Sequence, residues 1–418
     1  MAIDLIKLAD DPSNNLVLKT ARTERINTGN GPSDMPVYRV ALELLTYNVR
    51  NDRVASWVSA YRADHKDAPL EQLESEEINR IIEGFIVESN PPAIKQTQNN
   101  IKMRMQERPG VVLPDGIVID GNRRFTCLRR LHRELPERES DFGYFDTVIL
   151  PQSYASDPAT IKKLELSIQH ATEEKVGYDP VNRLVGIYND IINSETRLLS
   201  EAEYARFANI EPKELTKLKE QAIYLVEFLD YIGQPKQFHI ARDLKVAGPF
   251  GEMPAILKKC DNDSMREELK PIIFANLVAE PQSDPTRFIR KMKKIMASDG
   301  ARDFIESESD LAAEICERMA ACSDNPREGI KDIRGDEALS EELVSKLERA
   351  EENASRQKVL SSPADCIKKA TRALNQVEES LFCEYRDIDK DKLRDVERAL
   401  DELGRRMNEI RTELDNCL

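Results

Sequence analysis

The spacing of apolar residues changes along the chain, and this change divides it into two kinds of region. Short apolar and β-branched runs predict four β-strands, at residues 37–42, 111–113, 117–119 and 145–151. The Pro-Asp-Gly sequence at 114–116 is typical of a turn between the second and third runs. Apolar residues spaced three and four apart at 73–87 and 125–132 predict helices in the same region. Residues 36–156 are therefore expected to form a small domain with a mixed sheet.

From residue 157 onward, strand patterns nearly vanish and helical spacing continues to the end of the chain. Several segments begin with Asp, Ser or Glu near a proline, residues that favour the first turn of a helix. We expect a helical segment over 157–230, which includes a helix–turn–helix-like element, and a further helical domain over 231–360. Residues 1–35 are polar and end in loop-forming residues, so they are interpreted as a lead-in.

The segment 361–418 has the most regular pattern in the chain. Apolar residues alternate three and four apart over 393–417 and again over 367–381, which is the pattern of a coiled-coil seam. A polar stretch at 386–391 separates the two runs. The pattern suits an antiparallel helical hairpin or a dimerising coiled coil, and equally an amphipathic helix packed on its own domain. Homodimer formation and docking of partner proteins are both expectations for these C-terminal helices. The overall fold class is thus α+β.

Composition narrows the class of protein. With 418 residues, 40% hydrophobic and 33% charged, the chain is expected to be globular with two or three domains. A net charge of −15 argues against general coating of nucleic acid, while a local DNA-binding patch is still compatible with it. Seven scattered cysteines without a Cys-x-x-Cys pair fit a reducing compartment. No stretch approaches the roughly 20 apolar residues of a membrane span, so we expect a cytoplasmic protein without membrane contact.

The sequence "DGNRR" at 120–124 joins a predicted strand directly to a predicted helix. Backbone N–H groups at a helix start attract anions, and Gly121 would let a ligand approach the backbone. Arg123 and Arg124 can each bind phosphate oxygens through two N–H groups. Positive side chains at this helix end are unfavourable unless an anion balances them. The alternative, that both arginines pair with acidic side chains, has equal weight on the residues alone.

This junction resembles the second motif of the ParB/sulfiredoxin-like superfamily, Asp-Gly-x-x-Arg between a strand and a helix. Residues 44–54 ("LLTYNVRNDRV") are similar to an early Asn-x-Arg-Asn-x-Arg element, and 167–184 ("SIQHATEEKVGYDPVNRL") to a third motif. The resemblance covers about 36–230. Asn122 replaces the glutamate of partitioning ParB proteins, and the third motif lacks its Glu-Asn pair. The chain therefore resembles divergent relatives linked to DNA modification and defence.

The resemblance implies a site for a nucleoside triphosphate, ATP or CTP, with Mg²⁺. The residues that would hold phosphates are Gly121, Asn122, Arg123, Arg124 and Lys175. Additional site candidates are Asn48, Arg50, Asn51, Arg53, His170 and Thr172. Asp120 is the candidate metal ligand, and Asp120 and Glu173 are the candidate catalytic residues. A turn-capping role for Asp120 and a solvated helix face for Glu173 are the plainer alternatives.

The expected activity is nucleotide hydrolysis in a DNA-linked process such as DNA modification, phage defence or mobile-element maintenance. DNA phosphates would be contacted by Lys213 and Lys217 in the second helix of the helix–turn–helix-like element. One alternative is a non-catalytic DNA-binding scaffold or clamp that nucleotide switches. A second alternative is a small-molecule kinase acting on an amino acid.

Overall fold

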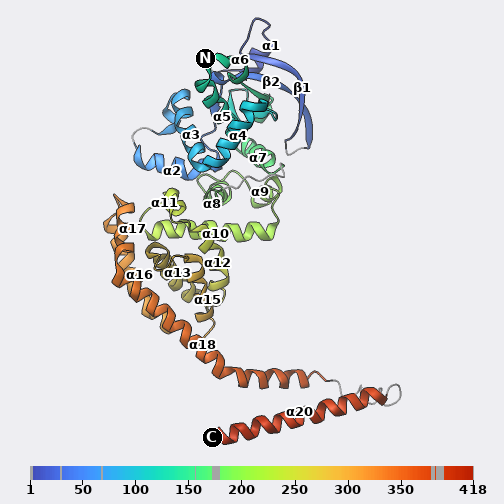
Figure 1. Cartoon of the computed structure of the whole chain (residues 1–418), viewed down its shortest axis with the longest axis vertical. Helices are drawn as coiled ribbons and strands as arrows, with labels where there is room; N and C mark the ends of the chain where they lie inside the picture. Colours follow the sequence, from blue (N-terminus) through green and yellow to red (C-terminus); the bar gives the residue numbers. More distant parts are fainter. Residues whose placement is uncertain are drawn as a thin grey trace. The chain divides into compact units, whose positions relative to one another are not determined.

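The computed structural model describes residues 3–28, 31–66, 69–155, 157–171, 179–377, 382 and 390–417. Two compact units divide the chain, Met1–Glu352 and Asn353–Leu418. The first unit contains a mixed β-sheet with its helices and a larger all-helical part (Figure 1). The expected combination of a small mixed sheet and a mostly helical remainder is confirmed.

Six strands form one sheet in the order β1-β2-β6-β4-β5-β3. Their bounds are β1 Val17–Asn27, β2 Pro32–Ala41, β3 Thr46–Tyr47, β4 Gly110–Val112, β5 Ile117–Asp120 and β6 Tyr144–Ile149. The pairs β1–β2, β2–β6 and β4–β5 are antiparallel, whereas β4–β6 and β3–β5 are parallel. All four predicted strands are present, and the predicted turn at 114–116 connects β4 to β5.

The interpretation of residues 1–35 as a lead-in is wrong. They contain helix α1 (Leu5–Asp10), strand β1 and the start of β2, so the sheet begins well before residue 36. β1 is an edge strand in which only Val17 and Ile26 are buried. Its backbone bonds to β2 rather than an apolar face hold it in place, and polar side chains are typical of such edges. This explains why apolar alternation did not predict β1.

Helices cover both faces of the sheet, because neighbouring strand residues point to opposite sides. Val112, Val118 and Phe145 belong to a core with helices α3, α4 and α5, whereas Val111 and Val148 belong to a core with α7. The helices of this region are α2 Ala55–Asp64, α3 Ser75–Ser89, α4 Pro91–Arg104, α5 Asn122–Glu134, α6 Glu139–Phe142 and α7 Pro158–Ala171.

The rest of the first unit is helical around one continuous core that extends from Leu166 to Leu347. Its helices are α8 Pro180–Ile187, which continues as a π-helical turn Tyr188–Ile192, α9 Glu201–Phe207, α10 Pro212–Tyr231, α11 Phe238–Asp243, α12 Ala247–Leu257, α13 Asp263–Ala279, α14 Pro285–Arg290, α15 Met292–Ile295, α16 Ala301–Ala321 and α17 Pro326–Gly335. The predicted division between residues 230 and 231 does not separate two cores, because α10 packs on the helices that follow it.

Helix α18 (Glu337–Leu374) begins in the first unit and ends in the second, so the predicted boundary at 360/361 falls inside a helix. The second unit also contains α20 (Lys390–Cys417), one helix along the whole heptad pattern of 393–417. Residues 378–381 and 383–389 lie outside the described residues, so the hairpin stays a prediction. In the part of the chain that the structure describes, no helix has both the length and the apolar character of a membrane span.

Candidate functional site

The start of helix α5 lies at the centre of the candidate site. Strand β5 ends at Asp120, and Gly121 turns the chain with a φ of 92°, a left-handed conformation that glycine adopts without strain. A Cβ atom at Gly121 would lie 2.9 Å from the Phe145 ring and 3.2 Å from the Gly110 Cα. Gly121 is therefore required by the turn and by close packing inside the protein. The expectation that it admits a ligand is not supported, because its Cα faces the protein's own atoms.

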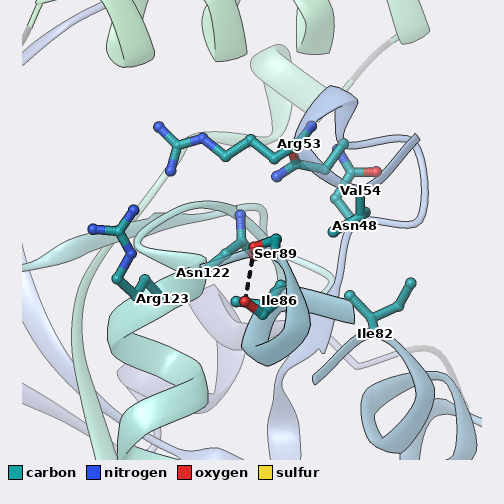
Figure 2. A pocket seen from close by; sticks show the side chains of 9 residues that line it. Asn48, Arg53, Val54, Ile82, Ile86, Ser89, Asn122 and Arg123 are labelled. Atoms are coloured by element: carbon teal, nitrogen blue, oxygen red, sulfur yellow. Dashed lines mark hydrogen bonds between the residues drawn. The ribbon is translucent and has the colours of Figure 1, made fainter. Parts of the chain in front are cut away.

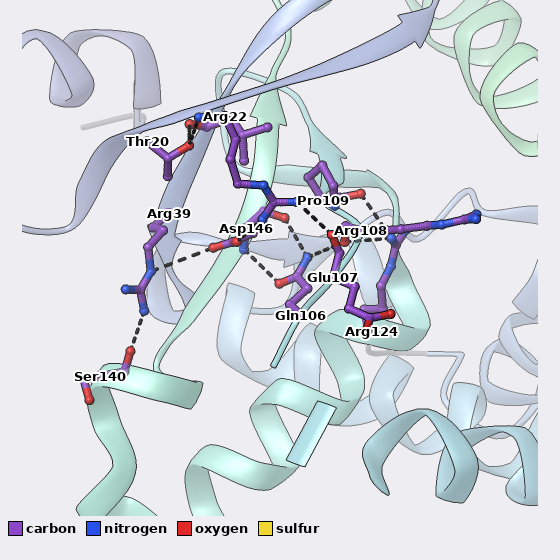
Figure 3. A network of polar contacts seen from close by, with 11 residues as sticks. Thr20, Arg22, Arg39, Gln106, Glu107, Arg108, Pro109, Arg124, Ser140 and Asp146 are labelled. Atoms are coloured by element: carbon purple, nitrogen blue, oxygen red, sulfur yellow. Dashed lines mark hydrogen bonds and ion pairs between the residues drawn. The ribbon is translucent and has the colours of Figure 1, made fainter. Parts of the chain in front are cut away.

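The two arginines at this helix start have different surroundings. Arg124 Nη2 bonds to Asp120 Oδ2 at 2.9 Å. Its Nη1 donates to the backbone oxygens of Arg108 and Pro109 at 2.8 and 3.1 Å (Figure 3). Asp120 and Arg124 thus pair with each other in this conformation. The predicted phosphate-binding role of Arg124 and the predicted metal-binding role of Asp120 stay predictions. Pairing with an acidic side chain, the plainer interpretation, holds for Arg124.

The loop that accepts these bonds from Arg124 is itself fixed by a polar network. Gln106 exchanges two hydrogen bonds with the backbone of Asp146, at 2.9 and 2.7 Å. Arg22 contacts the Asp146 carboxylate at 3.0 Å and the Glu107 carbonyl at 2.7 Å (Figure 3). The network joins β1, β6 and the loop after α4, which keeps Arg124 turned toward the protein.

Arg123 faces the opposite way, into a pocket. Its guanidinium group forms no hydrogen bond or ion pair with the residues that the structure describes. Burial lowers the pKa of Arg123, and the positive charge of Arg53 lowers that pKa further. Figure 2 shows the guanidinium groups of Arg53 and Arg123 on the same side of the pocket. Two cations that face one hollow repel each other, and an anion between them would relieve the repulsion.

The pocket brings together parts of two predicted motifs. It is lined by Asn48, Asn51, Arg53, Val54, Ile82, Ile86, Ser89, Asn122 and Arg123. Asn122 is only 7% exposed, and its Oδ1 atom has no hydrogen-bond partner among the described residues. A buried polar atom without a partner is costly, so this acceptor is suited to a ligand that carries an O–H or N–H group. The hollow is open on one side, and its empty space of about 430 Å³ includes open solvent.

Backbone-directed side chains shape the loop that carries Arg53. Asn48 Oδ1 accepts from the Arg50 N–H at 3.0 Å, and Asn51 Oδ1 accepts from the Arg53 N–H at 2.9 Å. These bonds are typical of asparagine turns. Arg50 itself is exposed and is not among the residues that line the pocket, so its predicted place in the site stays a prediction.

Helix α8 supports this loop from the helical part of the unit. Asn182 is fully buried; its Nδ2 donates to the Arg53 carbonyl at 2.8 Å, and its Oδ1 accepts from the Ser56 N–H at 2.9 Å. Asp179 caps α8 by accepting from the N–H groups of Val181 and Asn182. Asn182 was not predicted as a site residue, although the Asp-Pro start of its helix was the available signal.

A buried ionic cluster lies beside the same loop. Lys162 of α7 contacts Asp52 at 2.5 Å, Asp190 at 3.1 Å and Glu165 at 3.5 Å. All four side chains are at most 11% exposed. Burial raises the pKa of Asp190, because the carboxylate form is poorly solvated there. The cluster joins the loop that carries Asn51 and Arg53 to α7 and to the π-helical turn, and the sequence analysis missed it.

The third predicted motif can be placed only in part. The backbone of His170 belongs to α7, but its side chain lies outside the described residues, as do Thr172, Glu173 and Lys175. Their predicted roles in the site stay predictions.

The predicted magnesium site rests on Asp120 and on the phosphates of a nucleotide. In the ranges that the structure describes, no group of three or more His, Cys, Asp or Glu residues could hold a metal ion. Asp120, the predicted ligand, is occupied by Arg124. The magnesium site stays a prediction.

The helix–turn–helix-like element is present as α9, a short turn and α10. Lys213 and Lys217 are exposed in the first turns of α10, whereas Lys219 pairs with Glu201. Two exposed lysines are available for phosphate contact, which is compatible with their predicted role.

Comparisons with other proteins give no family for this chain: no known protein family, curated protein or solved structure matches it.

Proposed function

We propose that this chain is a divergent ParB-like protein that binds the phosphates of a nucleoside triphosphate, ATP or CTP, in the pocket of Arg53 and Arg123. The observation that carries the proposal is Arg123, a partly buried cation beside a helix start with no acidic partner among the described residues. Helix N-termini and guanidinium groups both favour phosphate oxygens. Arg53, Asn48 and Asn122 line the same hollow.

The remaining walls of the pocket suit the nucleoside part of such a ligand. Asn122 Oδ1 lacks a donor, which a sugar hydroxyl or a base amino group can supply. Val54, Ile82 and Ile86 add apolar side chains to the lining of the pocket. A ligand that combines an anion, a hydrogen-bond donor and a flat apolar group satisfies all three features, whereas inorganic phosphate lacks the apolar group.

The test is isothermal titration of ATP and CTP into the full chain and two single variants. Arg123→Ala removes the cation from the pocket, whereas Arg108→Ala removes an exposed arginine from a nearby loop. A charged hydrogen bond is worth about 1.5–3 kcal/mol, so Arg123→Ala is expected to weaken binding at least about tenfold. Arg108→Ala should bind like the wild type. Equal affinity of all three proteins, or no heat with any nucleotide, would reject the proposal.

Hydrolysis in a DNA-linked process is the second half of the proposal and rests on the motif resemblance. Since Asp120 is paired with Arg124, Glu173 is the remaining candidate base. Phosphate release should then be lost in Glu173→Gln while nucleotide still binds. Release that is equal in wild type and Glu173→Gln would exclude Glu173 as the base.

A nucleotide-switched DNA scaffold is the competing function, and the exposure of Lys213 and Lys217 favours it. It predicts nucleotide binding without turnover, together with DNA binding that weakens as salt increases. Lys213→Ala with Lys217→Ala should reduce that DNA affinity and leave nucleotide affinity unchanged. Turnover of bound nucleotide would instead support the hydrolase.

A further inference from the structure

Helix α20 has an apolar seam that the described chain does not bury. The seam consists of Leu393, Val396, Leu400, Leu403, Met407, Ile410, Leu414 and Cys417. Leu400, Met407, Ile410 and Leu414 are 53%, 59%, 40% and 55% exposed. An apolar stripe of this regularity along a 28-residue helix is the pattern of a surface that packs against another helix.

The length of the seam indicates what covers it. On a straight helix, residues 393 to 417 extend over about 36 Å, at roughly 1.5 Å per residue. The second apolar stripe of this unit lies at the end of α18, where Ile367 and Leu374 are 51% and 42% exposed. In the sequence, that apolar run covers 15 residues (367–381), whereas the seam of α20 covers 25 residues (393–417). A second α20 therefore matches the length of the seam better than the α18 run does.

We propose that two copies of this chain associate through α20 in an antiparallel coiled coil. With Met407 of one copy opposite Leu403 of the other, the remaining layers follow from the heptad. Leu393 then faces Cys417, Val396 faces Leu414, and Leu400 faces Ile410 of the second copy. All eight seam positions of each helix gain a partner in this register, and every layer is apolar or contains the cysteine.

The charges beside the seam favour the antiparallel direction over the parallel one. In the antiparallel register, Glu397 lies opposite Arg411 of the second copy, and by symmetry this attractive pair occurs twice. Arg406 meets its own copy only once in this register. A parallel pair would place Arg406 against Arg411 twice, offset only by Lys392 against Glu397.

The first measurement is the mass of the full chain in solution by light scattering after gel filtration. The wild type is expected at twice its chain mass of 47.7 kDa. Met407→Glu puts a carboxylate into the two central layers and should yield the monomer. Asn408→Glu adds the same charge to the neighbouring outward position and should stay dimeric. Circular dichroism should show equal helix content in both variants. A monomeric wild type, or a dimer that survives Met407→Glu, overturns the proposal.

The second measurement fixes the direction. Positions 393 and 417 of one helix are about 36 Å apart, so a disulfide between them must join two chains. Mild oxidation of Leu393→Cys should link residue 393 to Cys417 of the second copy, identified by peptide mass spectrometry. Wild-type chains linked through Cys417 to Cys417 would indicate a parallel pair and overturn the antiparallel register. A link from Leu393→Cys to Cys366 instead of Cys417 would show that α18 covers the seam.

Discussion

Replacing Lys162 by methionine tests whether the buried ionic cluster holds the candidate site in place. The Lys162 Nζ atom lies 2.5 Å from Asp52, 3.1 Å from Asp190 and 3.5 Å from Glu165. Methionine has a side chain of similar length without the charge. Lys162→Met therefore removes the cation of the cluster and leaves the carboxyl groups where they are.

The expected loss of stability is large because the partners stay buried. Removing one member of a buried ion pair costs about 3–5 kcal/mol, which is much of the roughly 5–15 kcal/mol by which a protein domain is stable. Part of this cost is avoided when carboxyl groups take up protons, and burial already raises the pKa of Asp190. A raised carboxyl pKa favours folding at low pH, so the loss in Lys162→Met should grow as pH rises.

The assay is urea unfolding followed by circular dichroism at two pH values, with Lys163→Met as the matched control. Lys163 is the neighbouring residue, and its pair with Glu203 is exposed, so its loss should cost at most about 1 kcal/mol. Adding Asp190→Asn to Lys162→Met should recover part of the stability. Equal urea midpoints for Lys162→Met and Lys163→Met would refute the reasoning.

Three further predictions follow from single contacts. A Cβ atom at Gly186 would lie 2.6 Å from Asp52 Oδ2, so Gly186→Ala should lower the free energy of unfolding in urea by about 1–3 kcal/mol. Gly251 has open space around it, so Gly251→Ala should instead raise that free energy by up to about 1 kcal/mol. Equal changes in the two variants would contradict this prediction. Burial raises the pKa of Glu308 from 4.5 to about 7. The free energy of unfolding should therefore decrease as pH rises through this range, by at most about 3 kcal/mol. Glu308→Gln should remove this decrease. Parallel profiles of unfolding free energy against pH for the wild type and Glu308→Gln would contradict the prediction. Asn182→Ala removes the hydrogen bonds to the Arg53 carbonyl and the Ser56 N–H, so isothermal titration should show weaker nucleotide binding than in the wild type. Unchanged affinity would indicate that α8 does not support the pocket.

Local patterns in the sequence predicted most of the elements around the candidate site. Apolar runs gave β4, β5 and β6, and helical spacing gave α3 and α5, because each element has a buried face that repeats with its own period. Strand β1 was not predicted, because it is an edge strand that backbone hydrogen bonds to β2 hold in place, and its sequence has little apolar alternation. The glycine-containing junction was also visible, since a left-handed turn between strand and helix requires Gly121.

Only the tertiary structure decided which polar residues face one another. Arg123 and Arg124 are neighbours of the same type, yet one faces the pocket and the other binds Asp120 and a loop. Lys162 and Lys163 are likewise adjacent, yet one lies in a buried ionic cluster and the other is partly exposed. Periodicity is a local property that the sequence displays directly. The partner of a charged side chain is set by elements far away in the chain, such as α8 beside the loop at residue 53, and it exists only once the chain has folded.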